Sequence, residues 1–197
     1  MSDSLASWVA LHSVRGVGPV TFRRLVARFG TVERVLDESS AEALEGVLRL
    51  QPSVREGILR AKARLEWAER TIDALSGRGV SIVRMTDPVY PAALRELADG
   101  PPLLYAFGRW DLAESRGVGM VGATRPSQRG RDIARGLAAR LAERGVTVVS
   151  GYALGVDDAS HLGALEHGGA TVLCVPFGIR RFEPRAGWPG GEALARQ

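Results

Sequence analysis

Apolar residues recur with helical spacing through the first part of the chain, up to about residue 77. Spacings of three and four residues are typical of helices that bury one face. Ser4 and Thr31 are suitable N-cap residues, and Gly30 can end the helix that precedes it. We therefore predict a helical module whose helices span residues 4–14, 18–30, 31–39 and 53–79.

After residue 79 the pattern changes to short runs rich in β-branched residues. Strands are predicted over residues 80–85, 103–107, 117–122, 146–151 and 171–176. The last three are continuous apolar runs, which are typical of parallel strands covered on both faces. Helices are predicted between these three strands, so right-handed crossovers and a parallel sheet are expected; the helices span residues 127–144 and 156–167.

These patterns predict an α/β chain with two domains. Residues 1–78 form a helical module, and residues 79–197 form a Rossmann-like parallel-sheet domain. Three parallel strands are fewer than a doubly wound sheet usually has, so the second domain is predicted to be partial. A fragment, a naturally short protein, and a protein that covers its open edge with a partner all remain open as explanations.

Composition and charge narrow the class of protein. The chain has 26 basic and 22 acidic residues, a net charge of +4, and Lys62 as its only lysine. Arginine suits phosphate, so the charge is compatible with a nucleic-acid partner without specifying one. The chain has a single cysteine, Cys174, so an intramolecular disulfide is excluded. The sequence shows no metal-ligand spacing, and we expect neither a bound metal nor a cofactor. No signal peptide and no apolar run of about 20 residues is present, which predicts a cytoplasmic protein without a membrane span.

The turn between the first two predicted helices contains a Gly-Val-Gly sequence. This arrangement resembles the hairpin of a helix-hairpin-helix element, in which glycines allow a tight turn whose backbone N–H groups face a DNA phosphate. Gly16 and Gly18 are therefore candidates for a DNA contact. The alternative is a SAM-like packing module whose hairpin touches no DNA.

Two glycine turns follow successive strands of the second domain, and each opens a helix whose N-terminus can face an anion. The first turn, VGATRPSQRG, supplies backbone N–H groups and side-chain donors from Gly122, Thr124, Arg125 and Ser127. It is neither a G-x-G-x-x-G loop nor a Walker loop. An ordinary strand-to-helix turn is the alternative interpretation.

The second turn lies in SGYALGVDDASHLGAL, where Gly151 and Gly155 can let the backbone approach a ligand. Asp157 and His161 are four residues apart on one helical face. Because no serine, cysteine or second histidine is placed to complete a triad, we assign this pair to loop geometry instead of catalysis.

Two arginines, Arg180 and Arg181, follow the last predicted strand. They stand at the sheet edge where ligands of such folds bind, so they are candidates for electrostatic attraction of an anion. A solvated loop is the alternative interpretation.

Three segments together resemble the DNA-processing protein A family, also called Smf. YPAALRELADGPPLLYAFG, VGATRPSQRG and SGYALGVDDASHLGAL are similar to the family patterns YP..L, VGSR..S..G and SGLARGID..AH.GAL. The resemblance covers most of the chain and implies a non-enzymatic protein. Such a protein binds single-stranded DNA, protects it, and helps to load the RecA recombinase onto it during natural transformation. The resemblance also implies a homodimer.

The chain departs from the family pattern at three positions. Thr124 stands in place of the arginine of VGSR, Leu154 replaces the arginine of SGLARG, and Arg180 stands where an aspartate is expected. The family's later segment, with its FP.RNR motif and its surfaces for dimerisation and RecA contact, is expected to be missing.

The resulting hypothesis is a short DprA/Smf-like protein that binds single-stranded DNA through phosphate contacts. These contacts are assigned to Gly122, Thr124, Arg125, Ser127, Gly151, Gly155, Arg180 and Arg181. The rival hypothesis is a nucleotide-binding sensor or a nucleotide-cleaving enzyme of the related superfamily. Such enzymes carry a P-G-G-x-G-T loop, of which WPGG contains only the first part. A third hypothesis is an inert remnant of a larger fold.

Overall fold

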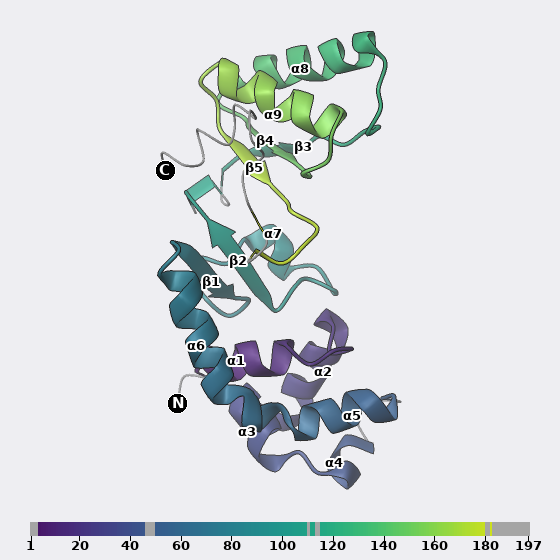
Figure 1. Ribbon diagram of the computed structural model, residues 1–197, viewed down its shortest axis with the longest axis vertical. Helices are drawn as coiled ribbons and strands as arrows, with labels where there is room; N and C mark the ends of the chain where they lie inside the picture. The colour runs from purple at the N-terminus through teal and green to yellow at the C-terminus, as the bar shows by residue number, and fades with distance from the viewer. Residues whose placement is uncertain (1–3, 46–49, 110, 113–114, 180–181, 183–197) are drawn as a thin grey trace. The chain divides into compact units, whose positions relative to one another are not determined.

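The computed structural model describes residues 4–45, 50–109, 111–112, 115–179 and 182. Contacts divide the chain into two compact units, Met1–Phe107 and Gly108–Gln197 (Figure 1). In the part of the chain that is described, no helix has the length and apolarity that crossing a bilayer requires.

Helices dominate the first unit, and their capping groups lie where the sequence predicts them. Ser4 Oγ accepts a hydrogen bond from the backbone N–H of Ser7, and Thr31 Oγ1 accepts one from Arg34. Gly30 ends the second helix with φ +92°. The helices are α1 (Leu5–His12), α2 (Pro19–Phe29), α3 (Val32–Glu38), α4 (Ala41–Glu45), α5 (Pro52–Leu59), the 3₁₀ turn η1 (Ala61–Arg64) and α6 (Leu65–Ser76).

The prediction of one long helix over residues 53–79 is wrong. Helices α5 and α6 run in different directions with η1 between them (Figure 1). The N–H of Ala63 bonds the carbonyl of Arg60, which is the i→i+3 bond of a 3₁₀ turn. The break lies close to Gly57, a weak helix former, where a Cβ would lie 2.6 Å from Val14 Cγ1. Both halves keep helical apolar spacing, so periodicity alone does not reveal the break.

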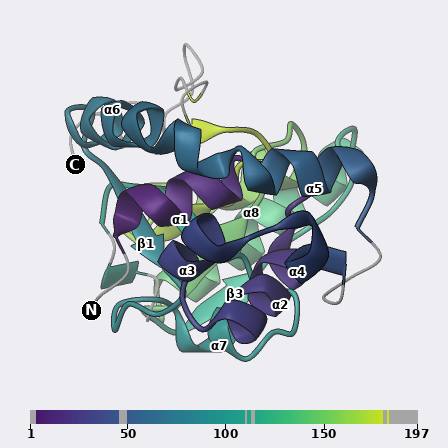
Figure 2. The same cartoon turned by 90° about the horizontal axis from the view of Figure 1, so that it is seen from below.

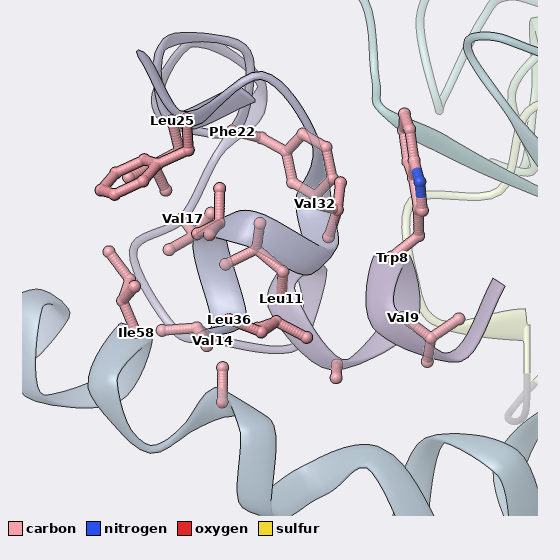
Figure 3. Close-up of a cluster of buried hydrophobic side chains, with 14 of the residues drawn as sticks. Trp8, Val9, Leu11, Val14, Val17, Phe22, Leu25, Val32, Leu36 and Ile58 are labelled. Atoms are coloured by element: carbon pink, nitrogen blue, oxygen red, sulfur yellow. The ribbon is translucent and has the colours of Figure 1, made fainter. Parts of the chain in front are cut away.

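The core of the first unit is built around α1. This helix lies between α3 and α6 (Figure 2) and is buried over five consecutive residues, as expected of a helix that is apolar on all sides. The rings of Trp8 and Phe22 are 5.0 Å apart between centroids. Side chains from α1, α2, α3 and α5 meet in this core (Figure 3); examples are Trp8, Leu11, Phe22, Leu25, Val32, Leu36 and Ile58.

A two-stranded antiparallel sheet completes the first unit. Strand β1 (Val80–Arg84) pairs with β2 (Leu103–Phe107), and the short helix α7 (Ala92–Arg95) lies in their connection. Leu103 packs in the helical core, which explains why the compact unit extends to Phe107 and not only to residue 78. The division into domains at residue 78 stays a prediction.

The second unit confirms the predicted three-stranded parallel sheet. Its elements are β3 (Gly117–Gly119), α8 (Gln128–Ala142), β4 (Thr147–Ser150), α9 (Val156–Glu166) and β5 (Thr171–Leu173), and the strand order is β3-β4-β5. Helices α8 and α9 lie side by side (Figure 1), as right-handed crossovers in this strand order require. The expectation that all three strands are covered on both faces is wrong for β3, whose residues are all exposed.

Small residues let α8 and α9 pack closely. A Cβ on Gly163 of α9 would lie 2.2 Å from the backbone oxygen of Arg135 on α8. Ala134 and Ala138 of α8 are buried in the same core, and Arg135 forms an ion pair with Glu166. Helices α8 and α9 therefore form a closely packed layer that supports the two glycine turns.

Candidate phosphate-binding site

The two glycine turns lie at one edge of the parallel sheet. The first turn follows β3 and the second follows β4, and these strands are neighbours with the same direction. The carboxyl ends of neighbouring parallel strands meet at one edge, where ligands of such sheets bind. The structure therefore brings the turn around Gly122 and the turn around Gly155 together.

Backbone contacts lock the two turns to each other. The N–H of Val156 donates to the carbonyl of Ala123 at 3.1 Å. A Cβ on Gly155 would lie 2.4 Å from that same oxygen, and a Cβ on Gly122 would lie 2.7 Å from Val156 Cγ2. Gly155 also has φ +95°, in the region that favours glycine. Both glycines are therefore needed for the turns to meet, and Gly155 is buried between them.

The two helix N-termini at this edge differ in their suitability for an anion. At α9 the first N–H, that of Val156, donates to the Ala123 carbonyl oxygen. Asp157 and Asp158 also place negative charge in the first turn of this helix. At α8 the first turn has no acidic residue, and Ser127 Oγ accepts from the N–H of Gly130 at 3.1 Å. The hydroxyl proton of Ser127 can therefore point outward. Of these two described helix N-termini, the start of α8 is the one that combines a free positive dipole end with outward donors.

Thr124 and Arg125 project from the first turn. Both residues are exposed, and no hydrogen bond or ion pair joins either side chain to another residue that the structure describes. Their donors are therefore available to a ligand at the start of α8. Arg180 and Arg181, assigned to the same surface from the sequence, lie outside the described residues.

His161 supports the second turn from inside the domain. The residue is fully buried, and its Nε2 lies 2.8 Å from the carbonyl oxygen of Gly151 while its Nδ1 lies 2.7 Å from Thr171 Oγ1. Burial lowers the pKa of His161 below 6.5, although the Gly151 contact and the charges of Asp157 and Asp158 oppose that shift. Nε2 donates its proton to the Gly151 carbonyl oxygen, and the Thr171 hydroxyl beside Nδ1 donates its own proton to the carbonyl oxygen of Val148 at 2.8 Å.

Asp157 supports the same turn from the other side. Its Oδ2 accepts a hydrogen bond from the N–H of Ala153 at 3.2 Å, and the residue is buried. A Cβ on Gly151 would lie 2.6 Å from that carboxylate oxygen. Asp157 and His161 thus both bond the loop, and the burial of His161 keeps its ring away from any substrate at the surface.

Apolar side chains surround the turns, which the sequence patterns did not single out as a group. The ring of Tyr152 lies 6.1 Å from that of Phe177 and 5.5 Å from that of Phe182 between centroids. Val121 is 91% exposed and Leu154 is 62% exposed. The available signal was apolar residues directly after strand ends, where turns are usually polar.

The two glycines of the hairpin in the first unit have different surroundings and therefore different roles. A Cβ on Gly16 would lie 2.5 Å from Val54 Cγ2, so Gly16 serves internal packing. A Cβ on Gly18 would meet nothing within 4 Å, and Gly18 is exposed at the N-terminus of α2. Of the two glycines, Gly18 is the one placed for an external contact.

Comparison with known proteins identifies the family. The model of the family described as DNA recombination-mediator protein A matches residues 81–190, which is more than half of the chain. The chain belongs to this DprA/Smf family. A second model, described as a DprA-like N-terminal HHH domain, matches residues 2–46 and confirms the helix-hairpin-helix character of the first module.

Individual relatives agree with this assignment. The chain is 31% identical to Protein Smf of Synechocystis over 183 aligned residues. This alignment covers 91% of this chain and 46% of the relative. It is 34% identical over 177 residues to a putative DNA processing protein DprA of Mycobacterium tuberculosis, which covers 84% of this chain and 41% of the relative. The chain therefore spans less than half the length of these curated relatives.

A solved structure supports the fold. The X-ray structure of DprA from Streptococcus pneumoniae matches with a TM-score of 0.61 and 23% sequence identity, covering 98% of this chain and 65% of that one. The predicted fold class, a helical HhH module with a Rossmann-like parallel sheet, is confirmed.

Proposed function

We propose that this DprA/Smf-family chain binds the phosphate backbone of single-stranded DNA at the first glycine turn. One observation carries the proposal: at the start of α8, Thr124 and Arg125 are exposed without a partner among the described residues, and no acidic residue lies in the first turn. A helix N-terminus with an adjacent arginine is a favourable site for a phosphate.

The other assigned residues have supporting roles in this proposal. Gly122, Gly151 and Gly155 give the two turns their shape, and Asp157 and His161 hold the second turn in place. Arg180 and Arg181 would add long-range attraction for the strand. Gly18 of the hairpin would offer a second, separate backbone contact. The ring of Phe177, which is 39% exposed, would provide a stacking surface for a base.

The family and the names of relatives described as DNA processing proteins support a biological role in DNA processing. In this role the protein would protect incoming single strands and assist RecA loading during natural transformation. It would act as a homodimer and without catalysis of its own. His161, the residue best suited to acid–base chemistry, is buried away from the surface, which favours a binding protein over an enzyme.

Fluorescence anisotropy with a labelled oligo-dT at two salt concentrations tests the proposal. Binding should weaken steeply with salt, because each neutralised phosphate releases counterions. Arg125→Ala should weaken binding by about tenfold, the loss expected for one charge-assisted contact. Arg116→Ala is the matched control: it removes the same charge from an exposed residue at the opposite end of β3.

Four outcomes would contradict the proposal. A folded protein that shows no binding at low salt would exclude the DNA role, and salt-independent binding would exclude phosphate contacts. An equal loss in both arginine variants would place the contact elsewhere. Thermal stabilisation by nucleotides instead of DNA would favour the rival hypothesis of a nucleotide sensor or nucleotide-cleaving enzyme.

A further inference from the structure

Arg23 of α2 carries a positive charge that forms no ion pair within the described part of the chain. Two of its three guanidinium nitrogens, Nε and Nη2, are buried and form no hydrogen bond to a residue that the structure describes. Arginine stays protonated in proteins, so titration cannot remove this charge. Buried charges are normally paired, because an unpaired one is costly. Arg23 therefore lacks the partner that its burial requires.

The backbone that follows α7 holds the Arg23 guanidinium in place. Helix α2 and the chain around α7 are neighbours in the first unit (Figure 2). A Cβ on the buried Gly100 would lie 3.0 Å from Arg23 Nη2 and 2.3 Å from the carbonyl oxygen of Leu94. The glycine therefore lets the backbone approach the guanidinium closely. Arg23 as a whole is only half-buried, so a ligand at the surface remains within reach of the group.

Arg95 brings a second positive charge to the same place. Its Cζ lies 5.9 Å from the centroid of the Tyr90 ring, and its Nη2 donates to the carbonyl oxygens of Asp87 and Tyr90. Burial raises the pKa of the Tyr90 hydroxyl, and the charges of Arg23 and Arg95 both oppose that rise. Both guanidinium groups are therefore close to this tyrosine. The acceptors of Arg95 are neutral carbonyl groups, so its charge is not compensated by them.

The acidic residues of this neighbourhood leave both charges uncompensated. Asp87 is paired with Arg84 at 2.7 Å. Glu96 and Asp99 follow α7 and are exposed, and among the residues that the structure describes neither forms an ion pair. Helix α2 has no acidic residue of its own. The first unit therefore has two positive charges beside Tyr90 and no described carboxylate bound to either.

We propose that Arg23 and Arg95 bind a phosphate group with two negative charges, as found at the end of a DNA strand or in a small phosphate compound. A terminal phosphate carries close to two negative charges at pH 7, and an internal phosphodiester carries one. Two uncompensated arginines match the first kind, and the guanidinium fork suits phosphate oxygens. Arg95 keeps Nη1 for this contact, because its carbonyl bonds use Nε and Nη2. The inference does not depend on DNA binding at the glycine turns, which lie in the other unit.

Thermal melting of the purified full chain in inorganic phosphate, at constant ionic strength, tests the site. At about ten times the dissociation constant, the folding equilibrium should shift about elevenfold toward the folded state and raise the melting temperature. Arg23→Met keeps an apolar stem and removes the unpaired charge. This variant should be at least as stable as the wild type without phosphate, and it should lose the rise. Arg28→Met, at an exposed arginine of the same helix, is the matched control and should keep it.

Oligonucleotides distinguish the two sources of the phosphate group. Oligo-dT with a 5′-phosphate is compared with the same strand ending in a 5′-hydroxyl, by fluorescence anisotropy with a 3′ label. If the ligand is a strand end, the wild type should bind the phosphorylated strand about tenfold more tightly, and Arg23→Met should bind both equally. If it is a small compound, the wild type should bind both strands equally while phosphate still raises its melting temperature. Arg125→Ala should weaken both strands by the same factor, which separates this site from the first glycine turn.

Four results would overturn the proposal. The first is a wild type whose melting temperature does not respond to phosphate, and the second is an Arg23→Met variant that responds as the wild type does. The third is an equal loss of the response in Arg28→Met, which would indicate a general effect of charge. The fourth is an equal response to acetate at the same ionic strength, which would indicate a carboxylate partner instead of a phosphate group.

Discussion

The backbone N–H of Val156 donates a hydrogen bond to the carbonyl oxygen of Ala123, across the gap between the two glycine turns. This bond gives the two turns different roles. The first N–H of α9 is used inside the protein, so α9 cannot offer it to a ligand. Within the residues that the structure describes, the side chains of Thr124 and Arg125 have no such contact, so the start of α8 is left as the outward-facing helix end.

The first prediction concerns the strength of this junction. Gly155→Ala should lower the free energy of unfolding by about 2–4 kcal/mol, because it combines an unfavourable positive φ with a Cβ 2.4 Å from the Ala123 oxygen. Gly145→Ala is the matched control, since Gly145 also has positive φ but open space around it. That variant should lose only about 1–2 kcal/mol. Urea denaturation followed by circular dichroism measures both, and equal losses would show that the turns are not tightly joined.

The second prediction concerns a half-buried ion pair in the first unit. Burial raises the pKa of Asp87, but the hydrogen bonds and charge of Arg84 outweigh burial and hold that pKa below its ordinary value of 3.8. The carboxylate therefore stabilises the fold above pH 3.8, and this contribution is lost as the pH falls through the lowered pKa. Asp87→Asn should cost about 1–3 kcal/mol at pH 7.

A second ion pair provides the control for Asp87. Asp111 forms a pair of similar length with Arg109, but both side chains are more than half exposed. Asp111→Asn should leave the free energy of unfolding almost unchanged, because water screens exposed pairs. If thermal melting showed the same loss in both variants, burial of the Arg84 pair would not be the cause.

Periodicity and capping residues were enough to locate most of the fold. Ser4 and Thr31 were expected as caps from local sequence alone, and both accept the capping hydrogen bond. The break between α5 and α6 was not predictable, because apolar residues keep helical spacing on both sides of the 3₁₀ turn. Local signals predict local bonds, whereas tertiary contacts override them.

The sequence was sufficient to predict which residues form the candidate site, but not the structural role of each one. Glycine turns after strands identified both Gly122 and Gly155 from the sequence. Only the structure shows that Gly155 is buried against the backbone of the first turn, so that it shapes the site without facing solvent. A spacing pattern cannot distinguish a glycine that admits a ligand from one that admits another loop.

The third prediction uses two glycines of the α8–α9 layer that should respond in opposite ways. Gly136→Ala should raise the free energy of unfolding by about 0.5–1 kcal/mol, because alanine favours the helix and its Cβ meets nothing. Gly163→Ala should lower it by about 1–3 kcal/mol, because its Cβ would lie 2.2 Å from the Arg135 carbonyl oxygen. Both should be measured by urea denaturation at the same protein concentration. A loss of stability in Gly136→Ala would mean that the position has an internal role after all.

The fourth prediction concerns acid sensitivity. Burial lowers the pKa of His161 in the folded protein below its unfolded value of 6.5. Below pH 6.5 the unfolded chain therefore binds a proton that the folded chain resists, so the stability present above that pH is lost as the pH falls. The loss can reach about 1.4 kcal/mol per pH unit for one such group. Burial also lowers the pKa of His12, so two groups contribute to the slope in the wild type.

Urea denaturation between pH 5 and pH 8 separates the two contributions. His161→Gln should be less stable at every pH, because it disturbs the contacts with Gly151 and Thr171, yet its stability should fall less steeply on acidification. The slope that remains should belong to His12, and adding His12→Gln should flatten it further. His167→Gln removes an exposed histidine from the end of α9 and controls for the loss of an imidazole. An unchanged slope in His161→Gln would show that the buried ring takes up its proton as readily in the folded protein as in the unfolded chain.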